Sequence, residues 1–509
     1  MVRPSRRKFV SAALVGLTAK AGRPIAGSFL DDGLPVGHHL ADRGRSGAPE
    51  IRVPVVIVGG GIAGLSAAWR LLKKGFRDFV VLELHVEAGG NSRSGENGIS
   101  RYPLAAHYVP LPNREAVLVR ELFEEFGAIE DGKYNERYLC FAPQERLFLH
   151  GRWQEGLEPE IAATARDREQ YQRFNDLMQQ FRATGQFTIP VDIGARLSDL
   201  DRISIAAWLD QQKFDSPYLR WYVDYACRDD YGARAADISA WAGIHYFASR
   251  EHGDKGPLTW PEGNGWIVRQ LMNRVGSHVR GNSPVYAIRR DGTRFRVLTS
   301  AADYNTDVVI FAAPTFLAPH LVEDAPPAHS FVYSPWLTAI LTLDRLPRER
   351  ESEPAWDNVI FDSPALGYVV ATHMSLRTQI DRTVWTWYWA LADGAPAQNR
   401  SMMLANNWGW FAEYILRDLE RAHRDIRQCV SRIDVLRMGH AMARPIPGFL
   451  GSEERRRWAS LTARLLYANS DLSGFSIFEE AQYRGVRAAD RALQIVGQAH
   501  SLRGAPSPL

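Results

Sequence analysis

The stretch "VPVVIVGGGIAGLSAAWRLLKKG", residues 53–75, decides the fold of this chain. Its first half is a short, uninterrupted run of β-branched residues, which is typical of a buried parallel strand. Residues 62–75 have the composition of a helix that ends at Gly75. A second buried strand, "FVVLEL", follows at 79–84. Together these pieces predict a βαβ unit of about 30 residues.

The glycines between the first strand and the helix predict a dinucleotide site. Gly59, Gly61 and Gly64 have the G-x-G-x-x-G spacing, which gives a tight turn, a close backbone approach to a pyrophosphate and close helix packing. The helix N-terminus, where Ala63 lies, offers unpaired N–H groups to phosphates. Glu83 ends the second strand, where an acid accepts hydrogen bonds from ribose hydroxyls. A purely structural glycine turn is the alternative, and the strand–helix–strand context disfavours it.

The rest of the chain alternates between helical and strand-rich stretches. Residues 113–250 place apolar residues at three-to-four spacing and predict helices. Strands are predicted within 284–314, which contains an Asp291-Gly292 hairpin signal, and within 331–395. A last buried strand and helix are predicted near the carboxyl end. This interleaving predicts an α/β protein with a discontinuous domain layout.

The segment after Glu83, "LELHVEAGGNSRSG" (82–95), resembles the flavin-containing amine oxidase superfamily. In that family a Gly-Gly pair, matched here at Gly90 and the residue before it, wraps the diphosphate of FAD. The family usually continues with arginine, whereas this chain has Asn91, Ser92 and Arg93. The resemblance implies FAD as the cofactor and these residues as part of its site.

Further matches to the superfamily follow in order along the chain. They are "RYPLAAHYV" (101–109), "WPEGNGWIVRQL" (260–271), "NSPVYAI" (282–288), "TDVVIFAAP" (306–314) and residues 465–493. The resemblance places Val285 beside the adenine, Asp471 near the ribityl chain or phosphates, and Phe478 and Glu479 near the flavin ring. Backbone donors at that edge stabilise negative charge on a reduced ring.

The resemblance also implies a domain layout. It comprises a doubly wound Rossmann-like FAD-binding domain and a discontinuous α+β substrate domain. The expected segments are 1–21 signal peptide, 22–50 linker, 51–112, 251–330 and 456–500 FAD-binding domain, and 113–250 and 331–455 substrate domain.

The superfamily resemblance predicts oxidation of a primary or secondary amine, polyamine-like, to an imine by hydride transfer to flavin N5. Oxygen or another electron acceptor would then reoxidise the flavin. Relatives often carry a lysine near the strand that here contains Leu337 and Thr338, with no lysine. Two alternatives stay open: an FAD-dependent desaturase or isomerase of an apolar substrate, and a flavin-binding protein without turnover.

Several residues are candidates for the substrate pocket. His107 and His440 are the catalytic candidates, each against the alternative of a structural histidine; His440 is expected in a Gly- and Pro-rich loop. The alternating indoles of Trp385, Trp387 and Trp389 could bind a cation, although plain core is favoured. "CRDDYG" (227–232) offers paired acids, but an exposed turn is the favoured interpretation.

The amino terminus predicts export. "SRRKFV" (5–10) resembles a twin-arginine signal, followed by an apolar run and an Ala-Lys-Ala site ending at Ala21. Removing the five positive charges of residues 1–21 takes the formal charge from +3 to −2, so nothing in the balance indicates a nucleic-acid partner. We expect passage through the twin-arginine export machinery to the periplasm or beyond, with no transmembrane segment. The three separated cysteines predict core thiols and no metal site.

Overall fold

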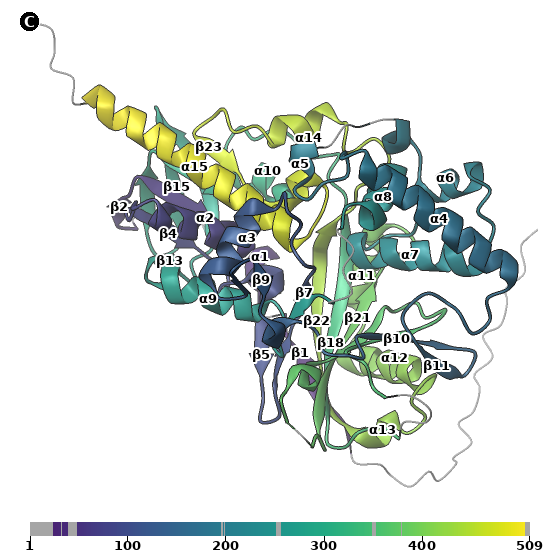
Figure 1. Ribbon diagram of the computed structural model, residues 1–509. Helices are drawn as coiled ribbons and strands as arrows, with labels where there is room; N and C mark the ends of the chain where they lie inside the picture. The colour runs from purple at the N-terminus through teal and green to yellow at the C-terminus, as the bar shows by residue number, and fades with distance from the viewer. Residues whose placement is uncertain are drawn as a thin grey trace, which may run out of the picture.

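The computed structural model describes residues 24–503 except 32, 39–47, 195, 196, 198, 251–255, 349–352 and 378. The predicted signal peptide therefore lies outside the described residues. Within them, no helix has the length and apolar character needed to span a membrane. Figure 1 shows a sheet with long helices beside it, a second and larger sheet, and a separate group of helices.

The first sheet has the order β13-β4-β3-β17-β23, and every neighbouring pair is parallel. Its strands come from distant parts of the chain: β3 (Val55–Val58), β4 (Phe79–Leu82), β13 (Val279–Arg280), β17 (Val308–Phe311) and β23 (Leu465–Tyr467). Every residue of β3, β4 and β17 is buried, as continuous apolar runs predict. The predicted Rossmann-like parallel sheet is thus confirmed.

Three helices pack against this sheet: α2 (Ile62–Lys73), α9 (Gly265–Val275) and α15 (Phe478–Arg503). Glycines set the closest approaches. A methyl group at Gly64 would lie 1.9 Å from the carbonyl oxygen of Gly59, and one at Gly485 would lie 2.0 Å from that of Ala63. Helices α2 and α15 therefore meet near the first turn of α2.

A four-stranded sheet adjoins this domain in the order β14-β15-β16-β2. Its strands are β14 (Val285–Asp291), β15 (Arg294–Thr299), β16 (Asp303–Thr306) and β2 (Glu50–Arg52). Arg294 pairs with Asp291 across the turn, so the Asp291-Gly292 hairpin prediction is confirmed.

The larger sheet has eight strands in the order β1-β22-β18-β21-β20-β19-β10-β11. They are β1 (Ala26–Phe29), β10 (Glu145–Leu149), β11 (Arg152–Glu155), β18 (Tyr333–Leu343), β19 (Asp357–Ile360), β20 (Gly367–Val370), β21 (Thr383–Ala390) and β22 (Val430–Ala443). Helix α12 (Trp408–Glu420) packs on one face. Along β21, Trp385 and Trp387 belong to that core, as favoured from the sequence, while Tyr388 faces the opposite side and donates to the Ala105 carbonyl at 2.8 Å.

The remaining elements complete the described structure. The helical group includes α4 (Ala165–Ala183), α6 (Ile205–Gln211), α7 (Pro217–Tyr231) and α8 (Ala240–Ala248), which lie together in Figure 1. The others are α1 (Gly33–His38), α3 (Val117–Glu125), α5 (Val191–Gly194), α10 (Ala318–Leu321), α11 (Pro396–Ala405), α13 (Ile426–Cys429), α14 (Glu453–Trp458), β5 (Ser94–Glu96), β6 (Arg101–Pro103), β7 (Tyr108–Val109), β8 (Ile129–Glu130), β9 (Lys133–Tyr134) and β12 (Leu258–Thr259). The three cysteines are buried free thiols, as predicted.

The predicted tether at 22–50 is wrong for residues 24–31 and 33–38, which we call the N-terminal strap. Strand β1 pairs in parallel with β22, from Ala26 opposite Arg432 to Phe29 opposite Val435. Gly27 is required there, because a methyl group would lie 1.8 Å from the Ile433 carbonyl oxygen. The pairing uses backbone groups, which explains why a segment rich in Gly and Pro, without apolar periodicity, still forms a strand.

Candidate active site

A cavity of about 350 Å³ runs along the carboxyl ends of β3 and β4. Ligands of open α/β sheets bind at this edge. The cavity is lined by most of the residues predicted to bind a cofactor, namely Gly59, Gly61, Ala63, Glu83, Gly90, Asn91, Ser92, Val285, Asp471 and Phe478. We call it the nucleotide cavity.

The glycine turn leaves room for a phosphate group. Gly59 has a φ of 103°, a conformation that favours glycine. A methyl group at Gly61 would meet no atom within 4 Å, so this position faces open space. Helix α2 begins at Ile62 without a side-chain cap on Gly61, which leaves first-turn N–H groups for an anion.

Glu83 is fixed at the wall of the nucleotide cavity. Its Oε2 accepts a hydrogen bond from the Gly60 amide at 2.6 Å, and its Oε1 accepts one from the His85 amide at 2.9 Å. The residue is 6% exposed. Because an ionised carboxylate accepts up to four hydrogen bonds, two further positions remain for ribose hydroxyls.

Asp471 lines the nucleotide cavity. It is buried, and its carboxylate accepts hydrogen bonds from the Thr315 amide at 2.7 Å, the Thr315 hydroxyl at 2.8 Å and the Tyr333 hydroxyl at 2.7 Å. Burial raises the pKa of this carboxyl group. The side chain thus joins β18 to the loop after β17 and forms cavity wall.

Three of the predicted cofactor residues do not line the nucleotide cavity. Gly64 contributes through helix packing, as described above. Arg93 lines a smaller neighbouring cavity together with Asp31 and Arg437. Glu479 faces a third cavity, of about 150 Å³, on the substrate side.

That third cavity lies between the nucleotide cavity and residues of α7, β18 and β21. It shares Asn91, Ala441 and Ile477 with the nucleotide cavity. Asn264, which is 2% exposed, lines both, and its Oδ1 has no hydrogen-bond partner among the described residues. A bound group that reaches this junction would satisfy that atom, since buried polar atoms are ordinarily paired.

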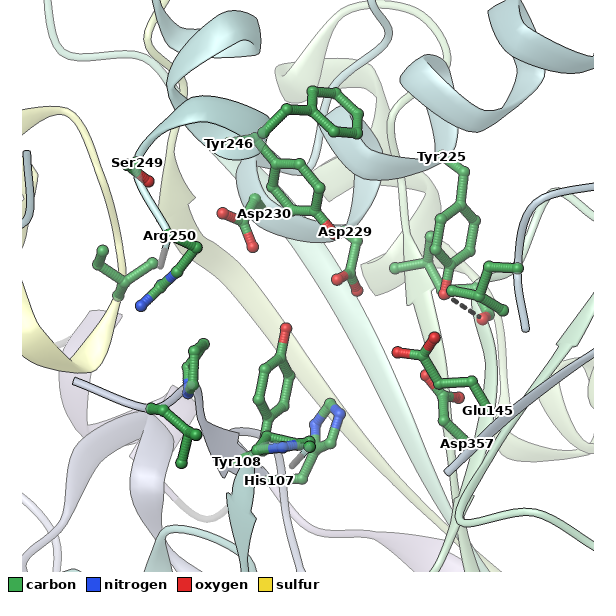
Figure 2. Close-up of a pocket in the computed structure, with 18 of the residues that line it drawn as sticks. His107, Tyr108, Glu145, Tyr225, Asp229, Asp230, Tyr246, Ser249, Arg250 and Asp357 are labelled. Atoms are coloured by element: carbon green, nitrogen blue, oxygen red, sulfur yellow. Dashed lines mark hydrogen bonds between the residues drawn. The ribbon is translucent and has the colours of Figure 1, made fainter. Parts of the chain in front are cut away.

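Beyond the junction lies a cavity of about 330 Å³ that is rich in carboxylates, which we call the acidic cavity. Asp229 and Asp230 project into it from α7, and Glu145 and Asp357 from β10 and β19 (Figure 2). The favoured sequence interpretation of Asp229 and Asp230 as an exposed turn is wrong. Helix α7 continues through both residues to Tyr231, and Gly232 then ends it in the left-handed conformation.

The acidic cavity contains one arginine among its described lining residues. Arg250 forms an ion pair with Glu479 at the start of α15, and it lowers the pKa of Asp230. Burial nevertheless raises the pKa of Asp230 to about 6. Burial, followed by the charges of Asp230 and Glu145, raises the pKa of Asp229 to about 8. Burial raises the pKa of Glu145 and Asp357 as well. These acids ionise most readily when a cation lies beside them, so the cavity suits a positively charged ligand.

Aromatic rings form another wall. His107 lies 4.7 Å from Tyr388, 4.9 Å from Tyr108 and 5.4 Å from Trp356, measured between ring centroids. Burial lowers the pKa of His107 to about 4, so the ring is neutral at pH 7. Its Nδ1 lies 3.3 Å from the Ala105 carbonyl oxygen.

The prediction that His440 lies in a loop is wrong. His440 lies on β22, because this strand continues to Ala443. It lines the nucleotide cavity and stacks on Phe316 with ring centroids 4.2 Å apart. Burial lowers its pKa to about 4. The two catalytic candidates therefore lie in different cavities.

Sequence reasoning missed Glu145, Arg250 and Asp357. Glu145 is on β10, Asp357 is on β19 and Arg250 follows α8, and none belongs to a motif. Phe475 also lines the acidic cavity. Thr338 donates to the Leu104 carbonyl at 2.7 Å, and Leu337 is in the core behind the sheet. No lysine is among the described residues that line the three cavities.

Comparisons with known proteins support the Rossmann-like domain. Residues 57–126 match the family model of an NAD(P)-binding Rossmann-like domain. A Baeyer-Villiger monooxygenase of Penicillium patulum is 35% identical over 95 residues, which are 19% of this chain and 14% of that protein. A probable flavin-containing monoamine oxidase A of Dictyostelium discoideum is 21% identical over 294 residues, covering 54% of this chain and 60% of that protein. Both matches span less than two thirds of the relative.

Solved structures match over most of the chain. Putrescine oxidase with bound putrescine has a TM-score of 0.67 at 17% identity, over 88% of this chain and 100% of the other. Cyclohexylamine oxidase from Brevibacterium oxydans has a TM-score of 0.66 at 14% identity, over 87% of this chain and 99% of the other. A fatty acid isomerase from P. acnes has a TM-score of 0.62 at 14% identity, over 86% of this chain and 98% of the other. The chain shares the fold of all three.

Proposed function

We propose that this chain is an FAD-dependent oxidoreductase that oxidises a positively charged, polyamine-like primary or secondary amine to an imine. The observation that carries the proposal is the acidic cavity, which joins the nucleotide cavity through the junction at Asn91, Ala441 and Ile477. Putrescine oxidase and cyclohexylamine oxidase share the fold. Water would then release an aldehyde and the smaller amine from the imine.

The nucleotide cavity fits FAD by the chemistry of its walls. The turn at Gly59 and Gly61 would hold the diphosphate at the start of α2, and Glu83 would hold the ribose next to Val285. Backbone N–H groups at the start of α15, beginning at Phe478, would face the flavin end. When bound, FAD would supply the acceptor for a hydride equivalent from the carbon next to nitrogen.

The chain's own residues would bind and orient the amine. Asp229, Asp357 and Glu145 would pair with an ammonium group, and the rings of Tyr108, Trp356 and Tyr388 would border the alkyl chain. Bringing a cation beside these carboxylates favours their ionised form. His107, neutral in the same wall, would stay available as a proton acceptor and is the catalytic candidate on the substrate side.

The alternative of an apolar substrate rests on one match, the fatty acid isomerase fold. Against it, Glu145, Asp229, Asp230 and Asp357 all line the acidic cavity, and burying polar carboxyl groups beside an alkyl chain that offers them no hydrogen bond is unfavourable. The alternative of a protein without turnover predicts a filled pocket. Instead, the third cavity shares lining residues with both the nucleotide cavity and the acidic cavity.

The experiment is anaerobic mixing of the purified protein with putrescine, n-butylamine and a long-chain fatty acid, followed by absorbance in the flavin bands. Bleaching by putrescine, with peroxide or another reduced acceptor formed on reoxidation, supports the proposal. If neither amine bleaches the flavin bands, the proposal is wrong. Bleaching or double-bond migration with the fatty acid alone would favour the apolar alternative.

We further propose that the protein is exported through the twin-arginine pathway to the periplasm or beyond. The support is "SRRKFV" at 5–10, and the physical motive is that a site assembled from distant segments holds FAD only after folding. Changing Arg6 and Arg7 together to lysine tests this in a bacterial host. Retention of the doubly substituted protein in the cytoplasm is expected, and unchanged export would refute the route.

A further inference from the structure

Two carboxylates of the acidic cavity, Asp229 on α7 and Asp357 on β19, come from elements joined by one buried arginine. We propose that Arg228 is a positioning residue, which fixes Asp229 relative to Asp357 and thereby sets the preference for substrates with a second positive charge. This inference rests on the proposed function.

Arg228 bridges the helix and the loop between β19 and β20. It is 2% exposed. Its Nη1 donates to the carbonyl oxygens of Ser363 at 3.1 Å, Pro364 at 3.3 Å and Ala365 at 3.5 Å. On the same helix, the Tyr225 hydroxyl donates to the Leu366 carbonyl at 3.3 Å. The loop that follows the Asp357 strand is therefore bound to the helix that carries Asp229.

Helix geometry gives these contacts their effect on Asp229. Arg228 and Asp229 follow Tyr225 by three and four residues, so all three side chains lie toward one side of α7. Two of the three bind the β19–β20 loop, and the third points into the acidic cavity, which Asp357 also lines (Figure 2). A shift of α7 away from the loop would move Asp229 away from Asp357 as well.

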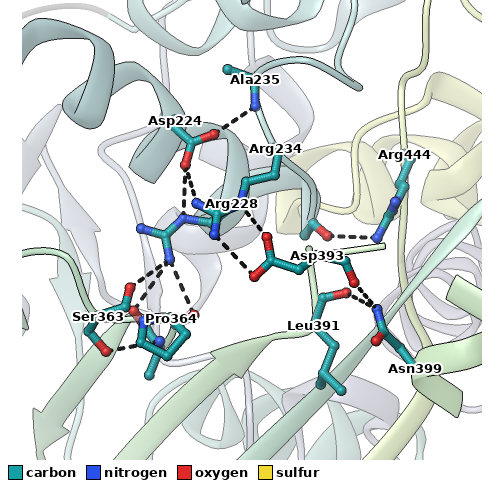
Figure 3. A network of polar contacts seen from close by, with 12 residues as sticks. Asp224, Arg228, Arg234, Ala235, Ser363, Pro364, Leu391, Asp393, Asn399 and Arg444 are labelled. Carbon is teal, nitrogen blue, oxygen red and sulfur yellow. Dashed lines mark hydrogen bonds and ion pairs between the residues drawn. The ribbon is translucent and has the colours of Figure 1, made fainter. Parts of the chain in front are cut away.

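The other side of the guanidinium is held by Asp224 (Figure 3). Arg228 Nε lies 3.3 Å from Asp224 Oδ2, and the same carboxylate accepts from Arg234 Nη1 at 2.6 Å and from the Ala235 amide at 2.9 Å. Arg234 in turn forms two hydrogen bonds with Asp393, at 2.8 and 3.1 Å. Asp224 thus connects the buried Arg228 to Arg234, which is partly exposed.

Arg228 and Arg234 differ in a way that provides a matched control. Arg234 is 35% exposed and its partner Asp393 is 68% exposed, measured on the side chains, so solvent screens their interaction. Arg234 also makes none of the recorded contacts with residues 363–365. Lysine at position 228 would keep the charge, but a single ammonium cannot reproduce the planar fork of arginine.

The experiment compares Arg228→Gln, Arg228→Lys and Arg234→Gln, each loaded with FAD, on putrescine and on n-butylamine. For both Arg228 variants, KM for putrescine should rise on the order of tenfold, the effect of a lost charge-assisted hydrogen bond. KM for n-butylamine, kcat for both amines and the FAD content should change less than about twofold. Arg234→Gln should leave the ratio of the two KM values at the wild-type level.

Equal losses on both amines would overturn the inference, because they would indicate a general structural role. A matching KM split in Arg234→Gln would also overturn it. If Arg228→Gln does not fold, Arg228→Lys decides between these outcomes. If neither amine reduces the wild-type protein, both the proposed function and this inference are refuted. If the wild type is active but the Arg228 variants do not show the difference between the two KM values, only the inference is refuted.

Discussion

Asp31 of the N-terminal strap forms a buried ion pair with Arg437 of β22. Arg437 Nε and Nη2 lie 3.1 and 2.5 Å from Asp31 Oδ2, and the guanidinium also covers the Phe29 ring at 3.9 Å. Further along the strap, Gly37 lines the nucleotide cavity. The ion pair thus anchors a segment that closes part of the cavity in which FAD would bind.

Asp31→Ala should therefore accelerate FAD release. The change removes two charge-assisted hydrogen bonds to a buried arginine, each worth about 1.5–3 kcal/mol. The strap should detach more often, and FAD fluorescence after dilution should appear roughly tenfold faster or more. Ser28→Ala is the control, because the Ser28 hydroxyl contacts Asp434 at 3.0 Å from an exposed position. Equal release rates for both variants would show that the strap does not retain the cofactor.

Glu83→Ala should weaken FAD binding by roughly ten- to hundredfold, as expected for loss of hydrogen bonds to a charged acceptor. The substitution removes the acceptor for the Gly60 and His85 amides and for the ribose. Flavin content after gel filtration measures the effect. Glu87→Ala changes an exposed acid on the same loop and should retain FAD. Undiminished flavin in Glu83→Ala would count against the assigned nucleotide site.

Gly61→Ala and Gly64→Ala should fail in different ways. A methyl group at Gly64 would lie 1.9 Å from the Gly59 carbonyl oxygen, so Gly64→Ala should lower the melting temperature of the FAD-free protein. At Gly61 the methyl group meets no protein atom within 4 Å. Gly61→Ala should leave the FAD-free protein's melting temperature near wild type, yet reduce FAD content because the methyl group occupies phosphate space. Similar melting temperatures for both variants would contradict this distinction.

Asp229→Asn should make stability less dependent on pH. The folded pKa of Asp229, about 8, lies above its ordinary value of 3.8. Its contribution to stability is therefore complete below pH of about 4 and is lost as pH rises through about 8. The variant should melt at a higher temperature than wild type near pH 9, and the difference should shrink toward pH 5.

A matched control for this prediction has the opposite sign. The hydrogen bond from Arg234 lowers the pKa of Asp393, so its stabilising effect is present above the ordinary pKa and is lost in acid. Asp393→Asn should therefore gain no stability near pH 9. A gain of the same size in both variants, measured by thermal melts across this pH range, would exclude the assignment of the effect to the acidic cavity.

The Rossmann-like unit was predictable because its signals are local. Continuous apolar runs, the glycine spacing and an acid at the strand end each depend on neighbouring residues. The acidic cavity was not predictable in this way, because Glu145 and Asp357 meet Asp229 only through tertiary packing. An Asp-Asp pair before Tyr231 and Gly232 suggests a turn, whereas the helix continues through it and ends at the glycine. The strap was missed for another reason, since backbone pairing needs no side-chain periodicity.

The contact between Gly485 and Ala63 has a consequence for the dimensions of the site. The first turn of α2 lines the nucleotide cavity where the diphosphate of FAD would lie, and the first turn of α15 lines it where the flavin would lie. Where the two helices touch, nothing larger than a hydrogen atom fits at position 485. A larger residue at position 485 would push the two helices apart, and would thereby change the spacing of the two cavity walls from a position that does not line the cavity.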